Sequence, residues 1–180
     1  MKKIIIALFC FISINASAQF VNAELQASGL TCSMCSKAIY KALEKVIFVE
    51  SIDSDIKTST YKIKFKKDLP VSFDELKKAV TNAGFSVAQL KVKTVFNNLK
   101  IENDSHVQLG GNTLHFMNVK NQVLNGQQMI TIVDKDFIPG KDYKKYSKLT
   151  AKKCYESGKM ESCCTKNSSN KVERVYHTTI

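Results

Sequence analysis

Hydrophobic positions between Ala23 and Val92 follow two alternating periods. Runs that alternate or are rich in β-branched and aromatic residues predict strands, and spacings of three and four predict helices. Ser72 and Glu75 form a capping box that starts the second helix, and Gly84 suits its end. The expected strands are 23–30, 46–52, 59–65 and 85–92, and the expected helices are 33–45 and 73–83. This β-α-β-β-α-β order is that of the ferredoxin-like fold.

After Lys93 the pattern changes to short strand-like runs separated by turn signals. Asn97-Asn98 and Gly110-Gly111-Asn112 predict turns, and Asn125-Gly126 predicts a hairpin. One helix is expected from Asp142 to about Tyr155, and a last strand over 172–180. The fold class is therefore α+β: a ferredoxin-like domain over 22–92, then a small β-rich domain with one helix over 97–180.

The first 18 residues have the pattern of a cleaved secretory signal. Lys2 and Lys3 precede an apolar run from Ile4 to Ile14, and small residues lead to a cleavage point after Ala18. The apolar run is about half of the roughly 20 residues that a spanning helix needs, so a membrane anchor is the weaker alternative. We expect an exported protein, periplasmic or secreted, with no membrane span after cleavage.

The charge and the motifs of the chain argue against a nucleic-acid-binding protein and against an enzyme. The chain has 27 Lys and Arg residues against 16 Asp and Glu, a net charge of +11. The basic residues are spread along the chain, so we expect a solvated basic surface and no nucleic-acid partner. The sequence contains no Ser/His/Asp set, phosphate-binding glycine loop or paired-carboxylate signature. We therefore do not expect an enzyme.

Cys32 and Cys35 are the first candidate metal ligands. The expected strand enters the expected helix between them, so one thiol lies in a loop and the other in the first helical turn. Thiolates bind soft ions such as Cu(I) and Hg(II), and a helix N-terminus stabilises the thiolate form. The loop holds no His, Asp or Glu as a third ligand, which favours two-coordinate Cu(I) over closed structural Zn(II). A disulfide or a thioredoxin-like redox pair has the same spacing and stays open.

A second group of sulfur-containing residues lies near the C-terminus: Cys154, Met160, Cys163 and Cys164. Thiolates with a thioether could bind Cu(I), but a disulfide from Cys154 to Cys163 or Cys164 suits an oxidising compartment better. His115 and Met117 share one face of an expected strand, where they could bind metal, but packing or surface roles are the favoured interpretation. His106 is placed in a polar turn, and His177 lies beyond the cysteines.

The segment Gly29-Leu-Thr-Cys-Ser-Met-Cys35, with Ala83-Gly84-Phe85 after the second helix, resembles the heavy-metal-associated domain over about 22–92. This fold occurs in copper chaperones, in copper-pumping ATPases and in the exported mercury-binding protein. The resemblance implies that Cys32 and Cys35 bind the metal, that Thr31 shapes the loop and that Phe85 packs beside the site. Leu30 stands where relatives often have Met, and no Gly follows the first helix.

These features predict an extracytoplasmic protein that binds Cu(I) through Cys32 and Cys35 and sequesters or transfers it. The resemblance implies a metal-transfer partner, such as a metal-pumping ATPase or another thiol-rich or Met-rich metal protein. Hg(II) or another soft ion is the alternative cargo, because it uses the same ligands. A thiol-disulfide oxidoreductase, or a recruitment protein acting through its C-terminal half, is the alternative function.

Overall fold

The computed structural model describes residues 19–30, 32–161, 164 and 173–180. The N-terminal half has six elements, in the predicted order: β1 (Gln19–Ser28), α1 (Ser33–Glu44), β2 (Val49–Asp55), β3 (Thr60–Phe65), α2 (Phe73–Asn82) and β4 (Ser86–Ile101). The predicted capping box is present, because the Ser72 hydroxyl accepts a hydrogen bond from the Glu75 N–H. Gly84 follows α2 with φ +89°, a left-handed conformation that suits glycine.

The C-terminal half adds four strands and short helices: β5 (Ser105–Leu109), β6 (Asn112–Phe116), β7 (Gln122–Ile132), α3 (Gly140–Tyr146), the 3-10 helix η1 (Ser147–Leu149), α4 (Cys154–Ser157) and β8 (Val175–Thr179). The β-rich character of this half is confirmed. Among the residues described, no helix is long and apolar enough to cross a membrane.

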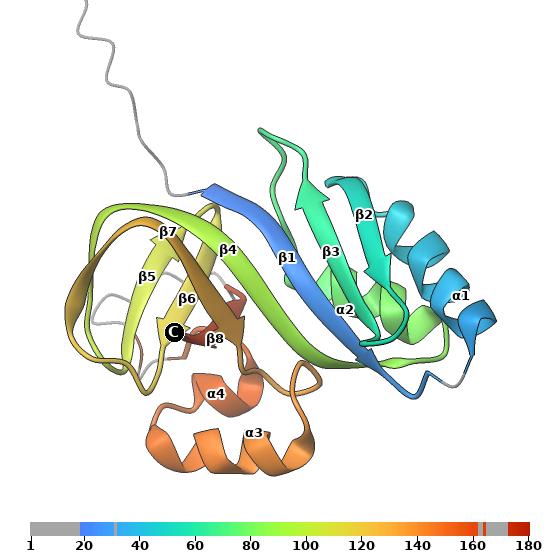
Figure 1. Ribbon diagram of the computed structural model, residues 1–180. Helices are drawn as coiled ribbons and strands as arrows, with labels where there is room; N and C mark the ends of the chain where they lie inside the picture. The colour runs from blue at the N-terminus through green and yellow to red at the C-terminus, as the bar shows by residue number, and fades with distance from the viewer. Residues whose placement is uncertain (1–18, 31, 162–163, 165–172) are drawn as a thin grey trace, which may run out of the picture.

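All eight strands form one sheet in the order β2-β3-β1-β4-β7-β8-β6-β5. The first four of these have the order of the ferredoxin-like fold, and α1 and α2 lie on the same side of them (Figure 1). All neighbouring strands are antiparallel except β6 and β8, which are parallel. The α+β fold class is therefore confirmed.

The hydrophobic pattern predicts that strand β4 ends at Val92. In the structure, β4 continues to Ile101. Its first part pairs with β1 and its whole length from Leu90 pairs with β7, so it passes from one half of the molecule into the other (Figure 1). The predicted boundary over 93–96 thus lies inside a strand. The division into two domains stays a prediction.

The turn predicted at Asn97-Asn98 and the hairpin predicted at Asn125-Gly126 are wrong. Both segments lie inside the paired strands β4 and β7, where they form a bulge. Between the pairs Phe96–Gly126 and Leu99–Leu124, two residues of β4 oppose one of β7. Asn98 has φ +47° and Gly126 has φ +71°, so the residues that suggested turns supply the left-handed backbone of the bulge. The ladder continues beyond it to Ile101.

The single helix predicted from Asp142 to Tyr155 is also wrong. It is interrupted after η1, where Thr150 is extended (φ −140°, ψ 147°). The Thr150 hydroxyl donates to Asp104 Oδ1 over 2.7 Å and accepts from the Lys152 N–H over 3.1 Å. Helical spacing cannot reveal these contacts, because Asp104 is distant in the sequence.

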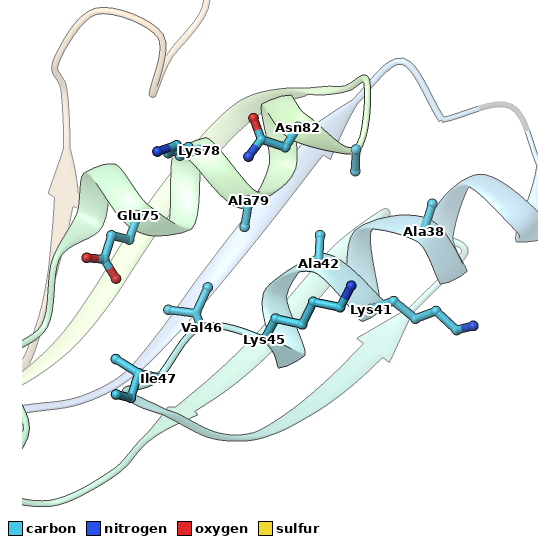
Figure 2. Close-up of a pocket in the computed structure, with 11 residues that line it drawn as sticks. Ala38, Lys41, Ala42, Lys45, Val46, Ile47, Glu75, Lys78, Ala79 and Asn82 are labelled. Carbon is cyan, nitrogen blue, oxygen red and sulfur yellow. The ribbon is translucent and has the colours of Figure 1, made fainter.

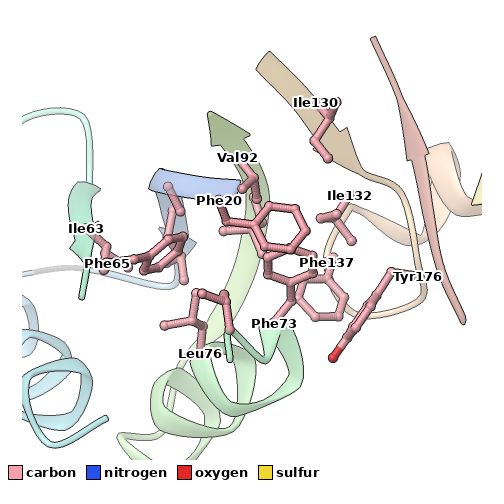
Figure 3. Packing of buried hydrophobic residues seen from close by; sticks show 14 of the residues in the cluster. Phe20, Ile63, Phe65, Phe73, Leu76, Val92, Ile130, Ile132, Phe137 and Tyr176 are labelled. Carbon is pink, nitrogen blue, oxygen red and sulfur yellow. The ribbon is translucent and has the colours of Figure 1, made fainter. Parts of the chain in front are cut away.

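The core is continuous across both halves. Phe73 at the start of α2 packs edge-on against Phe20 of β1 and Tyr176 of β8, with ring centroids 5.1 and 4.9 Å apart. Figure 3 shows these three rings beside Ile132 and Phe137. Phe20, Phe73 and Tyr176 are all buried, so the helical layer of the first half and the last strand of the chain share one hydrophobic cluster.

Polar contacts of Asp74 reinforce this junction. Its carboxylate accepts hydrogen bonds from Arg174 Nε over 2.7 Å and from the Tyr176 hydroxyl over 3.2 Å. Arg174 also lies 3.4 Å from Asp134. Burial opposes the ionisation of Asp74, but the hydrogen bond and charge of Arg174 outweigh it and lower the pKa of this carboxyl below 3.8.

We expect Asp74→Asn to lower the free energy of unfolding by about 1 kcal/mol at neutral pH, since Asp74 is 38% exposed and water weakens the ion pair. The folded-state pKa is depressed, so this stabilisation is present above pH 3.8 and is lost as the pH falls through the folded-state value. Urea unfolding at neutral and acidic pH measures both effects. Glu102→Gln is the matched control, because its ion pair with Lys100 is exposed on both sides. Equal losses in the two variants would contradict the prediction.

Candidate metal centre

The two cysteines of the first motif lie where β1 passes into α1. Cys32 is the extended N-cap residue of α1 (φ −155°, ψ 164°), and Cys35 lies in its first turn. The Cys32 carbonyl accepts from the Cys35 and Ser36 N–H groups over 3.2 and 3.3 Å, which fixes the bend between the two thiols. Cys32 is exposed and Cys35 is half-buried, and the first turn of α1 contains no acidic residue. The positive end of the helix therefore faces the sulfurs without a competing carboxylate.

The sulfur atoms of Cys32 and Cys35 lie 3.0 Å apart. A disulfide bond is about 2.05 Å long, so the two sulfurs are not bonded to each other. With a metal–sulfur distance of roughly 2.3 Å, two thiolates on one ion are separated by about 3.8 Å in tetrahedral and about 4.6 Å in linear geometry. Because Cys32 is exposed, its side chain can rotate to increase the separation of the two sulfur atoms without disturbing the core.

Two contacts hold the loop to the rest of the domain. The buried Tyr61 hydroxyl of β3 donates to the Ser36 carbonyl over 3.2 Å and lies 3.0 Å from the Ser36 hydroxyl. Burial raises the pKa of Tyr61, so it remains a protonated donor. On the other side, a Cβ at Gly29 would lie 3.8 Å from the Phe85 ring, which places Phe85 against the base of the loop. Thr31 lies outside the described residues.

The surface beside the loop is apolar with a basic rim. Met34, between the two cysteines, is 72% exposed. A groove of about 710 Å³ begins one turn further along α1 and separates it from α2. Figure 2 shows Ala42 of α1 and Ala79 of α2 facing each other across this groove. Its charged lining residues are Lys41, Lys45, Lys78 and Glu75.

The second cysteine group is only partly described. Cys154 begins α4 and is fully buried, and the Met160 N–H donates to the Glu173 carbonyl over 2.8 Å. Cys164 is half-buried, and Cys163 lies outside the described residues. The prediction of a disulfide or a metal site in this group therefore stays a prediction.

Sequence reasoning missed the side chains that surround Cys154. Its sulfur lies 3.4 Å from His106 Nε2, 3.8 Å from His115 Nδ1 and 3.5 Å from His177 Nε2. His106 lies on β5 and not in a turn, and His115 and His177 are fully buried. Burial lowers the pKa of His106 and His115 to about 4, so both rings are neutral at pH 7. The sequence offers a signal for two of the three, because His115 and His177 lie in predicted strands.

The part of the chain that contains Cys32 and Cys35 is similar to known proteins. Residues 24–86 match the heavy-metal-associated domain family. Among solved structures, oxidised MerP from Ralstonia metallidurans CH34 is 33% identical (39% of this chain, 97% of that chain, TM-score 0.33). The CopZ metallochaperone is 22% identical (37% and 98%, TM-score 0.34), and the yeast copper transporter domain Ccc2a is 24% identical (37% and 90%, TM-score 0.33).

A search of curated proteins finds no match to this chain. The matched residues 24–86 contain both cysteines of the loop, the supporting Tyr61 and the ring of Phe85. They also contain both helices and end where β4 begins. Residues 24–86 of this chain therefore belong to the heavy-metal-associated domain family.

Proposed function

We propose that this chain binds Cu(I) through Cys32 and Cys35 and carries it, without catalysing a reaction, to a metal-handling partner outside the cytoplasm. One observation carries the proposal: two thiols 3.0 Å apart lie on the accessible N-terminus of α1 in a heavy-metal-associated domain. Domains of this family bind and transfer heavy metals, and the chain's ligands are two soft thiolates.

The number of ligands favours Cu(I) as the cargo. Two thiolates suffice for linear Cu(I), and an ion with two ligands remains open to attack by a third thiol from a partner. Zn(II) normally requires four ligands, and the first turn of α1 contributes no acidic side chain to complete such a set. Hg(II) shares the preference for two thiolates, so it is the alternative cargo of the same site.

The surroundings of the loop support transfer rather than storage. Cys32 and Met34 are exposed, so a partner's ligand can reach the ion directly. The groove with Lys41, Lys45 and Lys78 on its rim suits a partner with acidic and apolar side chains. The secretory-type start of the chain, with Lys2 and Lys3 before the apolar run to Ile14, supports a location outside the cytoplasm.

We expect the reduced chain to take Cu(I) from a chromophoric Cu(I) chelator, and Cys32→Ser with Cys35→Ser to abolish this high-affinity binding. The physical reason is the loss of both soft ligands from the only accessible thiol pair within the described residues. Chelator absorbance measures the copper removed at each protein concentration.

The matched control for that titration is the double variant Cys163→Ser with Cys164→Ser, which removes two thiols from another segment. It should compete for Cu(I) as well as the unmodified chain does. If the Cys32/Cys35 variant retains the unmodified affinity, the assignment of the site is wrong. Repeating the competition with Hg(II) ranks the two cargos.

A redox function predicts a different behaviour. Cys32 and Cys35 lack the Trp and Pro residues that surround a thioredoxin-type pair, since the chain has no Trp and the segment between them is Ser33-Met34. We therefore expect no catalytic turnover in an insulin-reduction assay with dithiothreitol, relative to the Cys32→Ser control. Turnover that depends on Cys32 would replace the carrier proposal with an oxidoreductase.

A further inference from the structure

The chain contains three histidines, and the sheet places all of them in one row. His106 of β5 is the direct partner of His115 of β6, and His115 is the direct partner of His177 of β8. Residues that are paired across neighbouring strands point to the same face of a sheet. The His106 and His115 rings stack with centroids 4.4 Å apart, and the His115 and His177 rings meet edge-on at 5.0 Å.

Helix α4 brings one sulfur to this row. The Cys154 Sγ atom has a ring nitrogen of each histidine at 3.4 to 3.8 Å. The position of α4 is fixed by its neighbours: the Tyr155 hydroxyl donates to the Val133 carbonyl over 2.8 Å, and the Gly158 carbonyl accepts from the Val175 N–H over 3.0 Å. The sulfur is therefore directed at the histidines by the fold and not by a flexible tail.

Two carboxylates orient the inner imidazoles. Asp104 Oδ1 lies 2.8 Å from His115 Nε2, and Asp134 Oδ1 lies 2.6 Å from His177 Nδ1. An imidazole that directs an N–H at its carboxylate has its other nitrogen directed at Cys154, where the lone pair can bind a metal ion. One thiol proton can satisfy only one of these lone pairs. A carboxylate behind each histidine is the usual outer arrangement of a metal-binding histidine.

The sulfur–nitrogen separations are close to those around a tetrahedral metal ion, and the ligand atoms of Cys154, His106 and His115 all lie within 4.8 Å of one another. With metal–sulfur and metal–nitrogen distances of about 2.3 and 2.05 Å, sulfur and nitrogen ligands lie roughly 3.6 Å apart. The three sulfur–nitrogen distances at Cys154 lie on both sides of this value. We propose that the C-terminal half contains a second metal site, separate from the cysteine pair, whose four ligands are Cys154, His106, His115 and His177.

One thiolate with three imidazoles selects a transition-metal ion of intermediate softness, the class that includes Zn(II), Co(II) and copper. His115 and His177 are fully buried, and His106 is half-buried, so the ion reaches the site from the His106 side. The ion would replace the thiol proton of Cys154 and bind the sulfur and the three imidazole nitrogens together.

A catalytic cysteine is the competing explanation, because Cys154, His177 and Asp134 have the order of a nucleophile, base and orienting acid. Cys154 is 0% exposed, so a substrate cannot reach its sulfur. A nucleophile also needs one base, whereas here three imidazole rings converge on the sulfur. The burial and the number of rings both favour a metal.

The test uses the reduced full chain carrying Cys32→Ser and Cys35→Ser, so that the first site cannot take up the ion. Co(II) is the probe, because a thiolate ligand gives a charge-transfer absorption and tetrahedral Co(II) absorbs strongly in the visible range. We expect one equivalent of Co(II) to bind with both signals. Adding Cys154→Ser should remove the thiolate band, and adding His106→Gln should weaken binding more than tenfold.

Further variants test whether Met160, Cys163 or Cys164 binds the metal ion in place of the four proposed ligands. Met160→Leu, and Cys163→Ser with Cys164→Ser, should leave the Co(II) spectrum and affinity unchanged. Asp134→Asn should weaken binding 10- to 100-fold, as expected for a carboxylate that orients a ligand. Circular dichroism of the metal-free variants shows that each is folded.

Three results would overturn the proposal. One is the failure of the folded chain to bind Co(II) or Zn(II). Another is retention of the thiolate band in Cys154→Ser, and the third is its loss in the Cys163/Cys164 variant. Because the first site is already disabled, none of these results affects the proposed Cu(I) function.

Discussion

Strand β4 hydrogen-bonds to β1 along one edge and to β7 along the other, and this double pairing determines how the rest of the molecule is arranged. A buried strand must satisfy its backbone groups on both sides, so the last strand of the metal-binding domain also supports the C-terminal sheet. Phe73 and Asp74 add a second connection, because they pack and hydrogen-bond with Tyr176 of β8. The cysteine loop and the histidine row are therefore connected through one continuous sheet.

The two groups of proposed ligands differ in exposure and in orientation, two properties that separate transfer from retention. Cys32 is exposed at a helix N-terminus, and a partner can reach its sulfur. Cys154 is buried, and its surrounding imidazoles are oriented by Asp104 and Asp134. A two-thiolate site releases its ion to a competing thiol, whereas a four-ligand site with oriented ligands holds it. The chain thus combines, in our proposal, a carrier site with a resident metal.

Local patterns predicted the first half of the fold well, including the position of Cys32 and Cys35 at the start of α1. The capping box at Ser72, the glycine at position 84 and the Cys32/Cys35 spacing all act within a few residues of themselves. The prediction of the second half was wrong where contacts between residues distant in the sequence determine the structure. Left-handed backbone does occur at Asn98 and Gly126, as the turn signals there suggest. The two segments pair with each other, however, so they form one bulge in the sheet and not two loops. The histidine row depends on strand register, which no local pattern contains.

X-ray absorption at the copper edge, on the reduced full chain loaded with one equivalent of Cu(I), identifies the atoms that bind the ion. We expect a first shell of two sulfur atoms, because the exposed Cys32 and the half-buried Cys35 supply the ligands that Cu(I) prefers. A first shell containing imidazole nitrogen would contradict it, since that shell would place Cu(I) at Cys154 and the histidines.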